Sequence, residues 1–84
     1  MFFVYTLRSR KTGELYTGAT ADLHRRLGEH NQGISRSTKH AVLWELIHSE
    51  SFGTRAEAVR REQYLKTGKG REELKALLAP NRRP

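Results

Sequence analysis

The sequence has no cysteine, no long apolar run and few acidic residues, and each of these scarcities narrows what the protein can be. Without cysteine, neither a disulfide nor a thiolate zinc site can stabilise the fold. The lack of thiols is compatible with a reducing compartment, so we expect a cytoplasmic protein. The 84 residues suffice for one small domain, in which folding buries only ~60–65% of the surface that the unfolded chain exposes.

A short apolar stretch, Met1 to Leu7, opens the chain. It lacks a basic start and is followed at once by Arg8, and it is too short for a secretory signal or a membrane span. Its aromatic and β-branched residues are typical of a strand instead. No other apolar run approaches the length of a membrane span, so we expect a soluble protein without a membrane partner.

Basic residues outnumber acidic ones by 16 to 9, which gives a formal charge of +7. The excess is greatest near the C-terminus, because residues 61–84 hold seven basic and three acidic side chains. Such a surplus favours a polyanionic partner, since neutralised phosphates release their counterions. Nucleic acid is the leading candidate, and an anionic membrane surface comes second. The plain alternative is that the charge only keeps a small protein soluble.

The strand pattern predicts a small sheet. Residues 2–8 form the first strand, residues 9–13 are polar turn material, and residues 14–18 resume an extended pattern, which together predict a β-hairpin. Residues 42–49 alternate in polarity and predict a third strand. The basic segment at residues 33–41 has no periodicity and is expected to be a loop.

The first predicted helix follows the hairpin. Thr20 is its expected N-cap, with Asp22 in the first turn, where the helix dipole favours an anion. Leu23 and Leu27 lie one turn apart and give the helix a face toward the core. Gly33 is expected to end it after about residue 32.

Two more helices are predicted in the C-terminal half. Thr54 and Glu57 match a capping box, which begins a helix that runs to about Lys66. The Gly-Lys-Gly segment at residues 68–70 is expected to end this helix. A short third helix follows, and Pro80 is expected to stop it.

The predicted order is therefore β-β-α-β-α-α. It belongs to the α+β class, a small three-stranded and mainly antiparallel sheet flanked by helices. We expect one domain over residues 1–80 and a frayed basic tail at residues 81–84. The sequence contains no internal repeat and no linker that indicates a second domain.

Tyr5 and Tyr16 lie on the two strands of the predicted hairpin, where their hydroxyls can reach the same side of the sheet. Tyrosine is also a good strand residue that packs as a half-buried aromatic side chain. For either tyrosine alone, we favour that structural interpretation.

Arg26 and His30 lie one helical turn apart, beside the apolar face of their helix. In one interpretation they form a solvated ladder with Asp22, which contributes little to stability. In the other, Arg26 holds a phosphate with two hydrogen bonds and His30 exchanges a proton near neutral pH. Sequence position alone favours neither.

Glu62 lies in the middle of the second predicted helix, next to Arg60 and Arg61. Most glutamates are simply surface residues. A single carboxylate that faces a phosphate-binding surface can instead hold one Mg²⁺, an ion that keeps several waters and needs few protein ligands. Glu57 is the natural competitor, but the capping box already accounts for it.

Other catalytic motifs are missing. Residues 68–71 lack the spacing of a P-loop and do not follow a predicted strand. No histidine cluster indicates zinc, and no arrangement of serine, histidine and aspartate stands out. The candidates for chemistry are therefore the tyrosine, arginine, histidine and glutamate residues above.

In their order and spacing these residues resemble the GIY-YIG nucleases. The first motif of that family corresponds to Phe3-Val4-Tyr5 and the second to Tyr16-Thr17-Gly18. Phe3 and Thr17 depart from the glycine and isoleucine that give the family its name. Gly18 matches the second motif, in a structural rather than a chemical role.

The rest of the chain continues the resemblance. Arg26 takes the place of the family's essential arginine, His30 that of a polar residue one turn later, and Glu62 that of the metal-binding glutamate. Residues 66–71 resemble the end of the small stand-alone bacterial proteins of this family. The family also carries a C-terminal asparagine, for which this chain offers only Asn81.

The resemblance implies a metal-dependent nuclease. Mg²⁺ or Mn²⁺ on Glu62 would polarise the scissile phosphate, and Arg26 would hold a non-bridging oxygen. Tyr5 would act as general base or orient the attacking water, with Tyr16 positioning water or phosphate and His30 relaying the proton. A tyrosine with a pKa of ~10 is a poor base, so basic surroundings would have to lower the pKa of Tyr5.

Two further functions remain open. One is a nucleic-acid-binding module of the same fold with little or no cleavage, and the other is a basic adaptor for a larger complex. Whether the protein is a nuclease or only a nucleic-acid-binding module, additional phosphate contacts are expected from Lys39, His40, Lys66, Lys69 and Arg71. The chain has no room for a separate recognition domain, so a protein partner is a candidate source of specificity.

Overall fold

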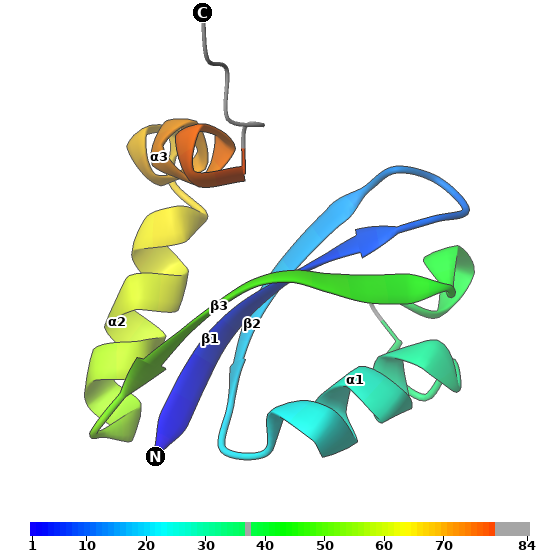
Figure 1. The fold of residues 1–84 in the computed structure, drawn as a ribbon, viewed down its shortest axis with the longest axis horizontal. Coiled ribbons are helices and arrows are strands. Elements are labelled where there is room, and N and C mark those ends of the chain that lie inside the picture. Colours follow the sequence, from blue (N-terminus) through cyan, green and yellow to red (C-terminus); the bar gives the residue numbers. More distant parts are fainter. Residues whose placement is uncertain (37, 79–84) are drawn as a thin grey trace, which may run out of the picture.

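The computed structural model describes residues 1–36 and 38–78. Along these residues the elements are β1 (Phe2–Ser9), β2 (Leu15–Thr20), α1 (Leu23–Asn31), the short 3-10 helix η1 (Lys39–Ala41), β3 (Trp44–Phe52), α2 (Arg55–Leu65) and α3 (Gly68–Leu78) (Figure 1). This confirms the predicted order and the α+β class. The expected stop at Pro80, the tail at residues 81–84 and Asn81 lie outside the described residues.

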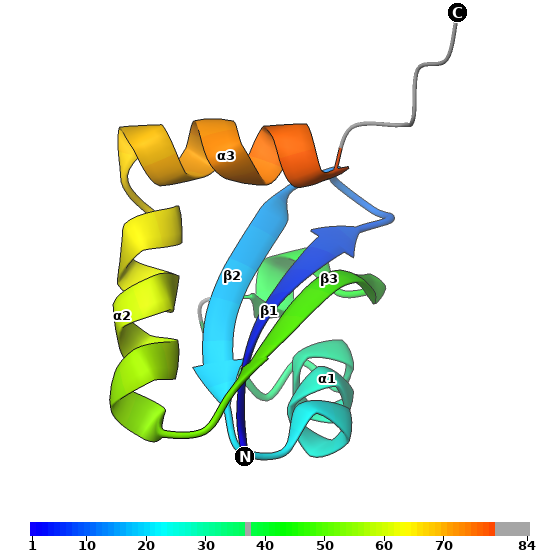
Figure 2. The same cartoon turned by 60° about the vertical axis from the view of Figure 1, so that its left-hand side comes forward.

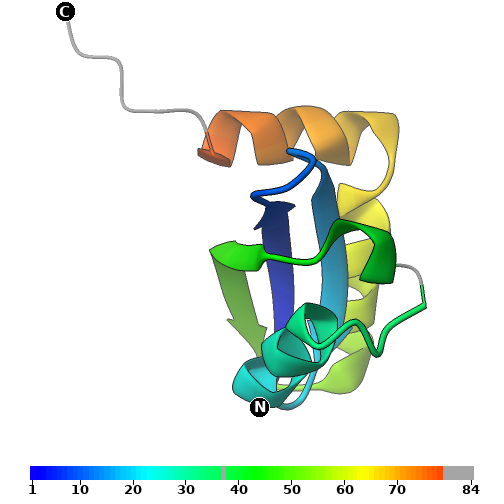
Figure 3. The same ribbon diagram turned by 90° about the vertical axis from the view of Figure 1, so that its right-hand side faces the viewer.

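The strands form an antiparallel sheet in the order β2-β1-β3. β1 is the central strand, and its residues Val4 to Leu7 are all buried, because helices cover the sheet on both faces (Figure 3). A bulge between Thr6 and Leu7 shifts the register against β3. Among the described residues, no strand pairs with the outer edge of β2, and α2 runs beside that edge (Figure 2).

Each face of the sheet carries its own apolar cluster. On the face covered by α2 and α3, the buried residues are Val4, Ala58, Leu65 and Leu74. On the face covered by α1, they are Tyr5, Leu7, Ala41 and Trp44. Leu23 and Leu27 pack against this second cluster, which confirms the predicted core face of the first helix. No helix within the described residues is long and apolar enough to cross a bilayer.

The predicted start of the first helix was wrong. Asp22, and not Thr20, is the N-cap, since its carboxylate accepts a hydrogen bond of 3.1 Å from the Arg25 backbone N–H. The Thr20 hydroxyl instead accepts the Asp22 backbone N–H at 3.1 Å and closes the turn before the helix. Both residues are good caps, and the turn between strand and helix decides which of them has the cap geometry.

The third strand starts two residues later than predicted and runs further. Leu43 has a φ of 75°, a left-handed conformation that interrupts an extended chain. The side chain of Asn31 then accepts from the Trp44 backbone N–H and donates to its carbonyl, which anchors the start of β3 to the end of α1. Alternation of polarity cannot reveal such a long-range anchor.

The capping box of α2 is confirmed in both directions. The Thr54 hydroxyl accepts the Glu57 backbone N–H, and the Glu57 carboxylate accepts the Thr54 backbone N–H, each at 3.2 Å. The prediction that residues 68–70 end the helix was wrong, because they form the first turn of α3. Gly70 is buried where α3 crosses the end of α2, and a Cβ there would overlap the Tyr64 carbonyl and the Leu65 Cα.

This crossing predicts that Gly70→Ala destabilises the protein strongly. Backbone atoms of α2 would have to move, and overpacking of this kind costs about 1–3 kcal/mol or more. Urea unfolding monitored by circular dichroism measures the effect. The matched control is Gly68→Ala two residues earlier, where an added Cβ meets nothing within 4 Å and alanine favours the helix. Equal midpoints for the two variants would show that the crossing is not tightly packed.

Candidate active site

The hairpin places two tyrosines together on the face covered by α1. In the β1–β2 register Tyr5 is opposite Gly18 and Leu7 is opposite Tyr16, so the tyrosine side chains emerge on one face, with ring centroids 6.2 Å apart. A Cβ on Gly18 would lie 2.6 Å from the Tyr5 hydroxyl oxygen and 2.9 Å from Cζ. The Tyr5 ring therefore lies across Gly18, in space that any side chain would fill.

His30 connects α1 to the tyrosines. Its Nε2 is 2.9 Å from the Tyr5 hydroxyl, and its ring centroid is 4.9 Å from that of Tyr16. The residue is completely buried, although it lies on a helix of mostly polar composition. A solvated ladder of Asp22, Arg26 and His30 is therefore not what the fold forms.

Thr38 completes a buried chain of hydrogen bonds. Its hydroxyl is 2.7 Å from His30 Nδ1, so both imidazole nitrogens are engaged, one by Tyr5 and one by Thr38. The Thr38 carbonyl accepts the Trp44 indole N–H at 3.1 Å, which ties this segment to β3. Sequence reasoning missed Thr38, because it lies in a segment without periodicity, eight residues from His30.

Arg26 lies beside this chain of hydrogen bonds with its side chain 31% exposed. Its Nη1 donates to Glu29 at 2.9 Å, and its positive charge and hydrogen bonding act on the Tyr5 hydroxyl to lower the pKa of that group. A guanidinium has five N–H donors in a planar fork, so these partners leave capacity for a phosphate.

Glu62 and Lys66 approach the tyrosines from α2, which lies along the free edge of β2. The Lys66 ammonium donates to Glu62 Oε2 at 2.7 Å and lies 5.9 Å from the centroid of the Tyr16 ring. The Glu62 carboxylate is close enough to Tyr5 for its charge to raise the pKa of the phenol. The structure thus gathers the predicted catalytic residues from β1, β2, α1 and α2: Tyr5, Tyr16, Arg26, His30 and Glu62.

Burial determines the protonation states in this site. It raises the pKa of Tyr5 to about 12, and the opposing effect of Arg26 only partly offsets it. A general-base role for Tyr5 required basic surroundings to lower this pKa; Arg26 acts in that direction, but burial outweighs it. Burial, assisted by the nearby charge of Arg26, lowers the pKa of His30 to about 4. At neutral pH the pair is a phenol and a neutral imidazole.

The carboxylate arrangement limits which metal site is feasible. Within residues 1–36 and 38–78, no three histidine, aspartate or glutamate side chains gather as a ligand set. Glu62 offers a single hard oxygen ligand next to the tyrosines. That donor set fits Mg²⁺ or Mn²⁺, which take water and substrate phosphate oxygens for most of their coordination. Lys66 would have to release the Glu62 oxygen that it now holds.

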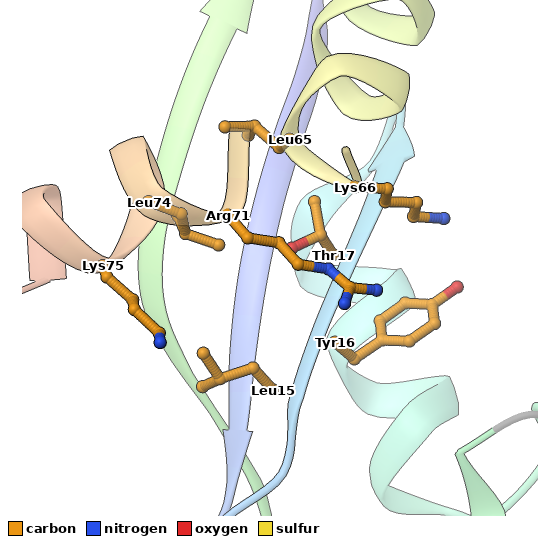
Figure 4. Close-up of a pocket in the computed structure, with 8 residues that line it drawn as sticks. All are labelled: Leu15, Tyr16, Thr17, Leu65, Lys66, Arg71, Leu74 and Lys75. Carbon is orange, nitrogen blue, oxygen red and sulfur yellow. The ribbon is translucent and has the colours of Figure 1, made fainter. Parts of the chain in front are cut away.

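A groove of about 400 Å³ runs from Tyr16 between β2 and α3 (Figure 4). Lys66 and Arg71 line it, as does Lys75, which sequence reasoning missed. The other predicted basic contacts lie elsewhere. Lys69 is exposed on α3 outside this groove, and Lys39 and His40 are exposed on η1, where His40 Nε2 lies 3.2 Å from the Glu14 carboxylate.

Comparison with known proteins places this geometry in a family. A profile described as "GIY-YIG catalytic domain" matches residues 1–75. The chain belongs to the GIY-YIG family. This is a family of nuclease type, and the match confirms the resemblance to it.

Relatives of this GIY-YIG protein are similar over most of their length. A UPF0213 protein of Staphylococcus saprophyticus is 34% identical over 76 residues, which cover 89% of this chain and 92% of the relative. A UPF0213 protein of Halobacterium salinarum is 40% identical over 67 residues, or 79% and 86% of the two chains. The solution NMR structure of a UPF0213 protein from Bacillus halodurans matches with a TM-score of 0.56 and 31% identity, covering 92% and 85%.

The buried His30 predicts that the GIY-YIG protein loses stability on mild acidification. Its pKa is about 4 in the folded state against 6.5 when exposed, so below pH 6.5 the unfolded chain binds a proton that the folded chain does not. Between pH 7 and pH 4.5 this costs about 2 kcal/mol, from 1.36 kcal/mol per pKa unit. Urea unfolding at successive pH values measures the slope.

The control for this prediction is His30→Gln, which keeps polar atoms in the site but has no titratable group. Its stability is expected to be lower at pH 7 and to fall less than that of the wild type between pH 7 and pH 4.5. Carboxylates with lowered pKa values, such as Glu29 and Glu50, destabilise both proteins alike as the pH approaches 4.5, so the difference between the two slopes is the contribution of His30. Parallel slopes for the two proteins would show that His30 is not the acid-sensitive group.

Proposed function

We propose that this GIY-YIG protein is a metal-dependent nuclease that hydrolyses phosphodiester bonds in nucleic acid, with DNA as the first candidate. The observation that carries the proposal is the 2.9 Å hydrogen bond between the Tyr5 hydroxyl and His30 Nε2, with Arg26 and Glu62 both acting on the same phenol. The Tyr5 hydroxyl then has three groups around it: the proton acceptor His30, the phosphate-binding cation Arg26 and the metal-binding carboxylate Glu62. These are the parts that phosphodiester hydrolysis requires.

The protonation states support a relay rather than a tyrosinate base. With a pKa of about 12, Tyr5 keeps its proton at neutral pH. As its oxygen takes a proton from the attacking water, its own proton passes to His30 Nε2. This requires the tautomer in which His30 Nδ1–H donates to the Thr38 hydroxyl oxygen, which lies 2.7 Å away and can accept it. Thr38 would thus fix the direction of the transfer.

Arg26 and Glu62 would share the charge on the phosphate. The guanidinium donors of Arg26 that remain free suit the non-bridging oxygens, where negative charge builds in the transition state. When Mg²⁺ or Mn²⁺ is bound at Glu62, it supplies Lewis-acid stabilisation of that charge. Lys66 would then exchange the Glu62 carboxylate for a phosphate oxygen, since it lies beside both Glu62 and Tyr16.

The alternative is a nucleic-acid-binding module with little or no cleavage. One observation favours it: the Glu62 carboxylate is already paired with Lys66 at 2.7 Å, which is what a purely structural glutamate would do. A protein partner that supplies specificity remains a prediction under either function. The cleavage experiment below separates the two functions.

Glu62→Gln and Arg26→Ala are each expected to reduce metal-dependent cleavage at least ~100-fold, as when a transition-state contact is removed. The assay follows plasmid, branched and single-stranded DNA with Mg²⁺, Mn²⁺ or chelator. Glu72→Gln, an exposed glutamate of α3, removes the same charge away from the site and should cut like the wild type. Full activity in a folded Glu62→Gln variant would show that Glu62 does not hold the metal. Binding of DNA without cleavage in any metal would favour the nucleic-acid-binding module.

Gly18→Ala is expected to lower the cleavage rate by ~10–100-fold while the fold survives, because small misplacements of catalytic groups have effects of that size. The new methyl group would push the Tyr5 ring off His30. Single-turnover cleavage and circular dichroism give the two readouts. Gly28→Ala on α1 is the control, since a Cβ there meets nothing within 4 Å. Unchanged cleavage by Gly18→Ala would show that the position of Tyr5 is not critical.

A further inference from the structure

The groove beside Tyr16 combines an apolar floor with basic walls. Its floor includes Leu15 on β2, Leu65 at the end of α2 and Leu74 on α3. Leu65 and Leu74 are buried core residues, only 1% and 5% exposed, so they form a rigid base beneath the groove, whereas Leu15 is 45% exposed and offers apolar surface to a ligand beside the Tyr16 ring. An apolar surface of this kind is free to cover an apolar part of a ligand.

The charge of the groove has one sign. Lys66, Arg71 and Lys75 line it, and none of its lining residues is acidic. Figure 4 shows these cations spread along the groove, with Lys66 and Arg71 near Tyr16 and Lys75 near Leu15. This row of cations complements a chain of phosphates rather than a single anion.

The groove is continuous with the candidate active site through Tyr16. The ring of this residue lines the groove and also lies 4.9 Å from the His30 ring, between their centroids. Lys66 lies at the same junction, since it pairs with Glu62 and also lines the groove. A strand whose phosphate lies at Arg26 and Glu62 can therefore continue past Tyr16 into the groove.

A single strand fits this combination of surfaces better than a duplex. A duplex hides the faces of its bases in the stack and presents phosphates and polar base edges. An apolar floor would then face charged groups, which is unfavourable. An unpaired strand offers phosphates and apolar base faces together, and proteins bind both at once with cationic grooves and packed side chains.

We propose that the groove between β2 and α3 binds an unpaired segment of nucleic acid, with bases against Leu15 and Tyr16 and phosphates on Lys66, Arg71 and Lys75. This inference rests on the proposed nuclease function and specifies its substrate class. The substrate has an unpaired segment next to the scissile phosphate, as in a flap or a splayed end. Continuous duplex lacks the part that the groove holds.

The test measures binding apart from cleavage. Fluorescence anisotropy in chelator compares a labelled single-stranded oligonucleotide, a blunt duplex of the same sequence and that duplex with a single-stranded flap. We expect single-stranded and flap DNA to bind at least ~10-fold more tightly than the duplex at equal salt, since base contacts add to the phosphate term. Cleavage of the same substrates with Mg²⁺ is followed in parallel.

Two pairs of variants locate the binding. Lys75→Glu and Arg60→Glu make the same charge change at exposed helical residues, but only Lys75 lines the groove. Leu15→Ser and Leu77→Ser truncate leucines that are 45% and 49% exposed, and only Leu15 lines the groove. The groove variants should weaken single-strand binding by ~5-fold or more, and the controls less than ~2-fold.

Each outcome separates this inference from the proposed function. Equal affinity for duplex and single strand, or equal losses in Lys75→Glu and Arg60→Glu, would overturn the groove as a single-strand site even if the protein cuts DNA. Groove-dependent preference without cleavage in any metal would uphold the binding site and overturn the nuclease. Absence of binding to every oligonucleotide would overturn both.

Discussion

The hydrogen bond between Tyr5 and His30 is the interaction on which the candidate site depends. Both residues are almost completely inaccessible to water, and burial holds both of them in their neutral forms. The bond forms only because Gly18 leaves room for the Tyr5 ring and Thr38 satisfies the second imidazole nitrogen. Throughout the described part of the chain, no buried side-chain nitrogen or oxygen lacks a partner. On the face of the sheet under α1, Tyr5, His30 and Thr38 thus form a hydrogen-bonded network that is enclosed by apolar side chains.

The opposite side of the sheet determines where Glu62 lies. Its neighbour Arg61 donates to Glu50 on β3 at 2.8 Å and to Glu73 on α3 at 2.6 Å, so α2 is joined to elements on either side of it. The tight crossing at Gly70 fixes α3 against the end of α2. With Arg61 directed toward β3, Glu62 and Lys66 lie on the part of the helix that faces the free edge of β2. The ion pairs of Arg61 thereby orient the Glu62 carboxylate, which they do not touch.

Local sequence signals predicted the order of elements, the capping box and the elements that carry the candidate catalytic residues. They failed where the structure depends on contact with a distant backbone segment or on how deeply a side chain is buried. The contact of Thr38 with His30 and the overlap at Gly70 depend on segments that meet only after folding. Burial raises the pKa of Tyr5 and outweighs the lowering effect of the basic neighbour Arg26, and composition alone does not reveal burial. Lys75 was missed because nothing in a helical sequence marks which lysine borders a groove.

The candidate site lies between a buried region that excludes water and an exposed region that carries positive charge. This position meets two requirements of the proposed chemistry, a neutral proton acceptor and accessible cations. An imidazole can accept a proton only while it is uncharged. The buried face under α1 keeps His30 uncharged at neutral pH because it excludes water. Phosphates need exposed cations, and these gather around the open edge of β2, at Lys66, Arg71 and Lys75. Arg26, which is half-buried, reaches both regions. A fold that closed the edge of β2 with another strand would keep the hydrogen-bonded chain from Tyr5 through His30 to Thr38 but would cover the approach to these cations. The open edge of β2 is therefore part of the candidate site.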